Sequence, residues 1–359
     1  MTTVNVVQGA IDGLAPFARA GGWDPVGLQI GDPDQEVSRA AVCHEVTSPV
    51  LERAIGDGID LLVSYHPLLF HPTTRLVAGP GPAGRALTLA AAGVSLLVVH
   101  TSFDVAPGGT ADALADALGL VDTRPFDPLW GPETAKVVTF VPEAAVDPVT
   151  DAMVDAGAGR IGAYSGCAFR VHGEGTFVPG VGAAPLVGNL GERSVAPEVR
   201  IEMVAPRSRV RGVVAALVAA HPYEEPAFDV YERLGDAGFL GRAGTFSGSF
   251  EDLVGDVQER IGGSLRCSGR PAGDRLTVGV VPGSGAPAIP RAAQAGVDVL
   301  VTGDVKHHDA RAAADLGMAV IDPGHAATEG PGIERLYAAV AAVIDDAIDL
   351  SGVDADPWA

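Results

Sequence analysis

The chain has 359 residues, of which 47% are hydrophobic, so it can form about two or three domains with sizeable cores. Its 45 acidic and 24 basic residues give a formal net charge of -21, which disfavours nucleic acid as a partner, because phosphate binding needs a basic surface. The most apolar stretch, residues 86–99, is too short for a membrane span, and no signal peptide is recognisable. Cys43, Cys167 and Cys267 lack CxxC spacing, which fits a reducing compartment. We therefore expect a cytoplasmic protein without a membrane partner.

Apolar, β-rich runs alternate with Ala-rich segments of helical period in the first and last thirds of the chain. This alternation favours βα units and a largely parallel sheet, hence an α/β fold. We expect the two thirds to build one continuous sheet. In the first third the expected strands are 40–46, 60–65 and 94–100, and the expected helices are 48–57, 82–92 and 110–118. In the last third the expected strands are 275–281, 298–302 and 318–321, and the expected helices are 289–295, 309–316 and 327–348.

The middle of the chain has a different pattern. Residues 135–234 predict the order strand, helix, short strands, strand, helix, strand, which is a ferredoxin-like α+β arrangement of domain size. We therefore expect a discontinuous α/β domain from residues 1–134 and 235–359, with 135–234 inserted as a separate domain. Within it, the Gly- and Pro-rich segment 173–197 predicts either a functional or interfacial loop or a flexible surface segment.

Four polar clusters follow predicted strands, and open α/β sheets place ligand sites at these strand ends. Each also has a simpler interpretation. His66 can be a satisfied structural group, Asp104 can begin a turn, and the adjacent His307 and His308 can contact substrate or cap a helix. The clusters are residues 65–67, 100–104, 302–309 and 322–329.

The last cluster gives the most specific spacing. If a helix begins near His325, then Glu329 lies four residues later on the same face, where both side chains can reach one metal ion. Such a pair occurs by chance in many helices. Combined with the polar groups at neighbouring strand ends, it predicts a metal site of mixed nitrogen and oxygen donors.

Five motifs together resemble the GTP cyclohydrolase 1 type 2 homologues, also called Ngg-interacting-factor-three-like dinuclear metal-centre proteins. The resemblance covers nearly the whole chain. It implies an α/β metal-binding domain, a toroidal homohexamer, and two divalent metals facing an internal cavity. The central segment, with GRIG at 159–162 and HPYEEP at 221–226, resembles the PII-like insertion of longer members. The motifs are WDPVGLQIG at 23–31, YHPLLF at 65–70, HTSFD at 100–104, GDVKHH at 303–308 and PGHAATE at 323–329.

The resemblance assigns four metal ligands, His66, Asp104, His325 and Glu329. Tyr65 stands where the family usually has a histidine, and a phenol does not replace an imidazole as a ligand. We therefore expect one or two divalent ions per chain, with zinc, iron, manganese and nickel all compatible with these donors, and a number nearer one than two. Glu45 takes the place of a family aspartate and is expected to line the centre rather than to bind the ion.

These features predict a metal-dependent hydrolase of a small nucleotide or cyclic amide. No catalytic residue is assigned by the sequence, although His100, Lys306 or His307 would orient substrate or carry a proton. The alternative is a non-catalytic oligomer that binds metal and an effector and regulates other processes. A metal-storage protein is a third interpretation. Fold and metal ligands alone do not define the reaction.

Overall fold

The computed structural model describes residues 2–129, 134–161, 164–233, 238–354 and 356–358. It divides into two compact units, which we call the first unit (Met1–Trp130 with Ala237–Ala359) and the second unit (Gly131–Asp236). In the described residues, no helix has both the length and the apolar character needed to cross a membrane.

The first sheet of the first unit has the strand order β1-β4-β3-β2-β15, and every neighbouring pair except β1–β4 is parallel. Helices cover both faces, and this explains why β2, β3 and β4 are continuous apolar runs rather than alternating ones. The strands are β1 (Gly27–Ile30), β2 (Arg39–Cys43), β3 (Leu61–Ser64), β4 (Ser95–Val98) and β15 (Asp346–Asp349). The helices around it are α1 (Val4–Leu14), α2 (Ser48–Gly56), α3 (Pro82–Ala91), α4 (His100–Val105) and α11 (His325–Ala341).

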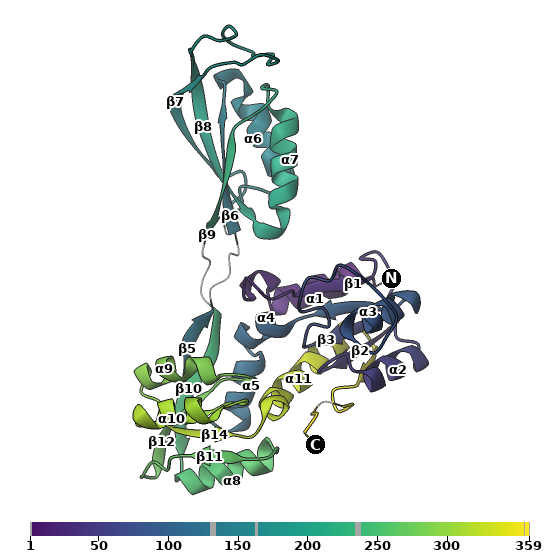
Figure 1. The fold of residues 1–359 in the computed structure, drawn as a ribbon, viewed down its shortest axis with the longest axis vertical. Helices are drawn as coiled ribbons and strands as arrows, with labels where there is room; N and C mark the ends of the chain where they lie inside the picture. Colours follow the sequence, from purple (N-terminus) through teal and green to yellow (C-terminus); the bar gives the residue numbers. More distant parts are fainter. Residues whose placement is uncertain (1, 130–133, 162–163, 234–237, 355, 359) are drawn as a thin grey trace. The chain divides into compact units, whose positions relative to one another are not determined.

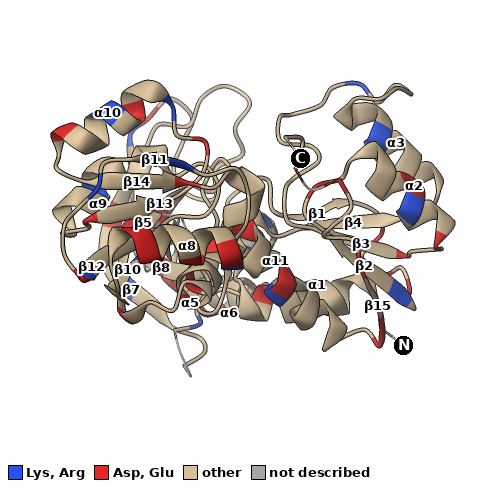
Figure 2. Ribbon diagram, turned by 90° about the horizontal axis from the view of Figure 1, so that it is seen from below, with Lys and Arg blue, Asp and Glu red and all other residues tan. Residues whose placement is uncertain are grey.

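The second sheet has the order β11-β14-β13-β12-β10-β5, with a parallel centre of β12, β13 and β14 and antiparallel strands on either side. Acidic residues, which are drawn red in Figure 2, contribute to the net charge. Some of them lie on helices that cover this sheet, such as α8. The strands are β5 (Val121–Leu129), β10 (Gly238–Ser247), β11 (Arg266–Ser268), β12 (Arg275–Val280), β13 (Val299–Val301) and β14 (Ala319–Asp322). The helices are α5 (Thr110–Ala117), α8 (Phe250–Arg260), α9 (Ile289–Gln294) and α10 (His307–Asp315).

The expectation of a single continuous sheet is wrong. Helix α11 packs against both α5 and β2 and runs between the two sheets (Figure 1). The expected helix 327–348 is also too long: α11 ends at Ala341, and β15 then joins the first sheet beside β2. The segment Asp346–Asp349 has too few residues to show a strand pattern, and its pairing with β2 is a contact between distant parts of the chain. The last third therefore contributes to both sheets.

The second unit follows the order strand, helix, strand, strand, helix, strand. Its sheet has the order β7-β8-β6-β9 with all pairs antiparallel, and α6 and α7 pack on one face through a core of its own. The two ends of the segment 173–197 belong to β7 and β8, and residues 178–193 form the loop between these strands. The elements are β6 (Thr134–Val141), α6 (Val146–Asp155), β7 (Ala168–Phe177), β8 (Ser194–Pro206), α7 (Val210–Ala220) and β9 (Phe228–Arg233).

In each unit, the two chain segments that lead to the other unit lie side by side. In the first unit Leu129 of β5 is paired with Gly238 of β10. In the second unit Thr134 of β6 is paired with Arg233 of β9. Because both junctions lie on adjacent antiparallel strands, a short loop between β5 and β10 would close the first unit without displacing either strand.

We expect that replacing residues 131–236 by a short linker leaves the first unit folded, because the second unit has a separate core. The measurement is thermal unfolding of the deletion variant followed by circular dichroism, with the full chain as control. A single cooperative transition is the expected result. An insoluble product, or one without a cooperative transition, would show that the second unit is integral to the fold.

Candidate metal centre

Three imidazoles follow the carboxyl ends of three adjacent parallel strands. His44 follows β2, His66 lies two residues after β3, and His100 lies two residues after β4. Main-chain hydrogen bonds continue the sheet beyond the strands, from the His66 amide to the His44 carbonyl (2.9 Å) and from the His100 amide to the Tyr65 carbonyl (2.9 Å). The parallel sheet therefore places these side chains at one edge, where open α/β sheets bind ligands.

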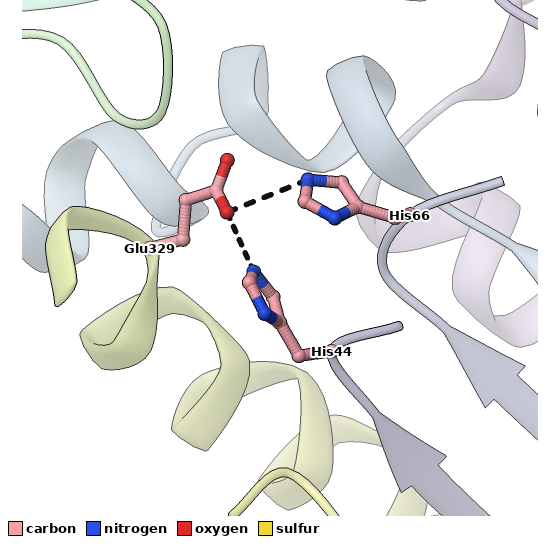
Figure 3. A group of neighbouring side chains, drawn as sticks. All are labelled: His44, His66 and Glu329. Atoms are coloured by element: carbon pink, nitrogen blue, oxygen red, sulfur yellow. Dashed lines mark hydrogen bonds and ion pairs between the residues drawn. The ribbon is translucent and has the colours of Figure 1, made fainter. Parts of the chain in front are cut away.

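Glu329 of α11 meets two of these imidazoles. Its Oε2 lies 2.6 Å from His44 Nε2 and 3.4 Å from His66 Nε2 (Figure 3). One ligand atom from each of the three residues lies within 4.8 Å of the others. The carboxylate of Glu329 is 4% exposed, so almost no water solvates its charge. The centre is thus a buried anion surrounded by nitrogen atoms.

His325 contacts the other oxygen of the same carboxylate. Its Nε2 is 3.1 Å from Glu329 Oε1, and its Nδ1 is 2.7 Å from Asp304 Oδ2. One helical turn separates His325 from Glu329, so both face the same side of α11. Asp304 has a φ of 56°, in the left-handed region that aspartate tolerates better than most residues, and its carboxylate holds the His325 ring in place.

Gly283, which follows β12, leaves room for these two side chains. A Cβ atom at this position would lie 2.5 Å from Glu329 Oε1 and 3.3 Å from His325 Nε2. Its φ of +63° also favours glycine. A residue of the segment after β12 therefore limits the space around ligands that the first sheet and α11 supply.

The charges of the centre are set by these contacts. Burial alone would raise the pKa of Glu329, but the neighbouring imidazoles of His325, His44 and His66 hold it well below its usual range. Burial lowers the pKa of His66 despite the nearby carboxylate. Burial would also lower the pKa of His325, but Glu329 and Asp304 together raise it to about 9. In the metal-free protein at neutral pH, the centre therefore contains the Glu329 carboxylate and a protonated His325.

Tyr65 and Asp104 form a second pair beside the first. The Tyr65 hydroxyl donates a short hydrogen bond to Asp104 Oδ1, and the Tyr65 ring is 5.0 Å from the His66 ring and 5.8 Å from the His44 ring. Burial and the Asp104 carboxylate raise the pKa of Tyr65 well above its usual range, so the phenol stays protonated. Burial raises the pKa of Asp104 to about 7 even though Tyr65 donates to it.

His100 is fixed by an aspartate from the N-terminal segment. Asp24 Oδ1 lies 2.8 Å from His100 Nδ1, and Asp24 Oδ2 accepts hydrogen bonds from the Thr101 amide (3.1 Å) and hydroxyl (2.5 Å). His100 has a φ of 35°, an uncommon conformation for a residue with a Cβ atom. Burial alone would lower the pKa of His100, but Asp24 raises it above the ordinary value. Asp24 therefore fixes the orientation of the His100 ring.

The residues fit a divalent cation. Imidazole nitrogens and a carboxylate are the donors that zinc, iron, manganese and nickel accept in proteins. His325 Nε2 is buried and, among the residues that the structure describes, has no partner with hydrogen-bond geometry, although it lies close to Glu329, so its lone pair is available once the proton leaves. A pocket of about 250 Å³ adjoins the ligands and gives room for a small group; the residues that line it are His44, Glu45, His66, Asp304, His325, Ala326, Asp356, Pro357 and Trp358.

Only some of the site residues predicted from the sequence lie together in the structure. It brings His66, His325 and Glu329 together, whereas Asp104 is bonded to Tyr65 rather than to Glu329. Glu45 is exposed and lines the adjoining pocket. The exposed Lys306 and His307, at the start of α10, make no hydrogen bond or ion pair within the described part of the chain with the triad, which is His44, His66 and Glu329.

His44 is not among the ligands predicted from the sequence. The next residue, Glu45, was expected to line the centre, and it is exposed at the adjoining pocket. The signal that would have identified His44 is its place directly after an apolar strand, next to the strand that precedes His66.

Comparisons with known proteins identify relatives of this chain. Residues 2–356 match the family described as Duf34/NIF3 (NGG1p interacting factor 3). The chain is 36% identical over 318 residues to a Bacillus subtilis protein named GTP cyclohydrolase 1 type 2 homolog, covering 87% of this chain and 85% of the relative. A Mycobacterium leprae protein of the same name is 37% identical over 333 residues, covering 89% and 85%. The crystal structure of a Bacillus cereus protein related to NIF3 aligns with a TM-score of 0.65 at 33% identity, over 100% of this chain and 99% of that one.

The pKa of His325 predicts how metal binding depends on pH. Because its pKa is about 9, His325 is protonated at about pH 8, and an ion that binds Nε2 must displace that proton. We expect about one proton released per zinc ion at this pH, and affinity that falls about tenfold per pH unit below 9. Calorimetric titration with zinc in two buffers of different ionisation enthalpy measures the release. It should disappear in His325→Gln; release that persists in this variant would contradict the assignment.

Proposed function

The chain belongs to the Duf34/NIF3 (NGG1p interacting factor 3) family, and on this basis we propose that it binds a divalent metal ion and hydrolyses a small nucleotide or cyclic amide. The observation that carries the proposal is the buried Glu329 carboxylate shared by His44, His66 and His325. The name of the relatives, GTP cyclohydrolase 1 type 2 homolog, supports a hydrolase of this class.

The proposed ligands are His66, His325 and Glu329 from the sequence prediction, together with His44. Asp104, the fourth predicted ligand, is proposed as a carboxylate at the margin of the centre, held by Tyr65. When bound, a divalent ion supplies a Lewis acid that polarises the bond to be cleaved and lowers the pKa of water.

The protein's own groups supply proton transfer and orientation. Asp24 accepts a hydrogen bond from Nδ1 of His100. Nε2 of this imidazole is therefore the atom that takes up or returns a proton. Asp304 holds the His325 ring in the same manner. The Glu329 side chain is almost completely buried, so the centre is closed to water on that side. The adjoining pocket of about 250 Å³ has room for only a small part of a substrate beside the ligands.

Tyr65 predicts the number of ions. Because its phenol remains protonated and bonded to Asp104, we expect about one ion per chain in the native protein and in Tyr65→Phe. Tyr65→His supplies the missing imidazole, and we expect about two ions per chain in this variant. Metal analysis of zinc-loaded, dialysed protein measures both numbers. Two tightly held ions in the native chain, both lost in Tyr65→Phe, would show that the tyrosine is itself a ligand.

Turnover tests the proposed reaction. The protein loaded with zinc, manganese or iron should be tested against panels of nucleotides, phosphoesters and cyclic amides, with product detected by chromatography. We expect hydrolysis that requires the metal and falls by at least about a hundredfold in His325→Ala, because a ligand and its proton are lost. His71→Ala, an exposed histidine, is the matched control. Turnover in metal-free protein, or in His325→Ala at the native rate, would contradict the proposal.

A regulatory oligomer is the second candidate, favoured by the second unit. Its order of elements and its sheet order β7-β8-β6-β9 are those of a ferredoxin-like fold, which supports the proposal of an inserted PII-like domain at residues 135–234. In this alternative the second unit binds an effector and the metal supports assembly. Ligand binding without turnover by any substrate on the panels would favour it.

Assembly into a homohexamer completes the proposal. A net charge of -21 repels other copies, but salt screens that repulsion over about 10 Å at 0.1 M, so apolar interfaces can still dominate. We expect light scattering in moderate salt to give about six times the chain mass of 36.4 kDa, with no dissociation as salt is raised. A stable monomer at micromolar concentration, with metal bound, would exclude the ring.

A further inference from the structure

A pocket of about 680 Å³ lies in the second unit, larger than the one beside the metal centre and within the range of small-molecule sites. Its floor is the sheet face that α6 and α7 leave open. By strand register, Phe140 of β6, Gly173 of β7 and Arg200 of β8 lie on this face, opposite to buried residues such as Ile201. Residues from 178–186 of the loop and from 223–227 form its walls.

Glu198 is held in the pocket by two neighbours. The Tyr223 hydroxyl donates to Glu198 Oε1 at 2.9 Å. Gly175 leaves the space that the carboxylate occupies, since a Cβ there would lie 2.2 Å from Glu198 Oε2. In the part of the chain that the structure describes, Oε2 makes no hydrogen bond. The carboxylate is therefore fixed by one oxygen and free at the other.

The charge of the pocket is negative. Four glutamates line it against a single arginine, Arg200. Arg200 is already engaged, because its Nε donates to Glu202 at 2.8 Å and its guanidinium lies 5.8 Å from the centre of the Phe140 ring. Glu224 closes one wall by accepting a hydrogen bond from the Ala184 amide at 2.9 Å. The four glutamates are Glu174, Glu198, Glu224 and Glu225.

Apolar and aromatic groups complete the lining. Phe140, Phe177 and Leu186 border the pocket, and the glycines of β7 leave open space above the sheet. At Gly173 a Cβ would meet no atom within 4 Å. A flat, uncharged body fits such walls, and aromatic faces also attract a cation.

From this combination we infer that the pocket binds an organic cation with a compact apolar body, an arylalkylammonium in chemical class. The ammonium group lies at Glu198, and the apolar body lies against Phe140 and the open backbone at Gly173. This inference rests on the second candidate function, the regulatory oligomer, and names the chemical class of the effector that its second unit would bind. It does not involve the metal ligands, so metal content measured on the same protein separates its failure from failure of the metal-centre proposal.

The test uses 2-phenylethylammonium as probe and the full chain. Calorimetric titration and ligand-observed NMR measure its affinity. The comparison ligands have a phenyl group on a similar chain: 2-phenylethanol is neutral, and 3-phenylpropionate is anionic. We expect the cation to bind at least about tenfold more tightly than either, because only it forms a hydrogen-bonded ion pair with the carboxylate.

Two variants locate the site. Glu198→Gln should weaken binding of the cation about tenfold, and Gly173→Leu should abolish it by filling the open space above β7. Matched controls are Glu232→Gln, an exposed carboxylate on β9 outside the lining, and Gly212→Leu, an α7 glycine with no atom near its Cβ position. Both controls should bind the probe like the native chain.

The inference is overturned if the neutral or anionic compound binds as well as the cation. It is also overturned if the native chain shows no binding at about 10 mM probe, or if a folded Gly173→Leu variant binds normally. Circular dichroism confirms that each variant is folded. If Glu198→Gln does not fold, Gly173→Leu and its control decide the result.

Discussion

The burial of one carboxylate constrains the arrangement of the first unit. Removing a charge from water costs several kcal/mol unless partners compensate it, and Glu329 is compensated by three imidazoles. Those partners come from the ends of β2 and β3 and from the first turn of α11, segments far apart in the sequence. The fold must therefore bring the first sheet and α11 together, while Gly283, in the segment after β12, leaves the required space.

The same geometry explains why the centre suits a cation. Parallel strands end at one edge, and the continuing main-chain hydrogen bonds fix the residues just beyond them. Hydrogen bonds to aspartates then orient the imidazole rings: Asp304 bonds Nδ1 of His325, and Asp24 bonds Nδ1 of His100. Tyr65 departs from this pattern, because it donates a hydrogen bond to Asp104 where an imidazole would offer a lone pair.

Local patterns in the sequence predicted the local parts of this arrangement. The four-residue spacing of His325 and Glu329 correctly indicated a shared helix face, and the apolar runs before His66 and His100 indicated buried parallel strands. Pairings between distant segments were not predictable in this way. The division into two sheets depends on which strands pair, and the four residues of β15 have no recognisable period. His44 was missed because the expected strand 40–46 runs past it, whereas β2 ends at Cys43.

A crystal of the zinc-loaded protein, measured at the zinc absorption edge, tests the central claim most directly. The geometry of the triad predicts an anomalous peak about 2.0 to 2.1 Å from the Nε2 atoms of His44 and His66, in contact with the carboxylate of Glu329. Zinc at that position would establish the buried carboxylate as a metal ligand. A fully loaded crystal whose zinc lies elsewhere, with the hydrogen bond between His44 and Glu329 intact, would contradict it.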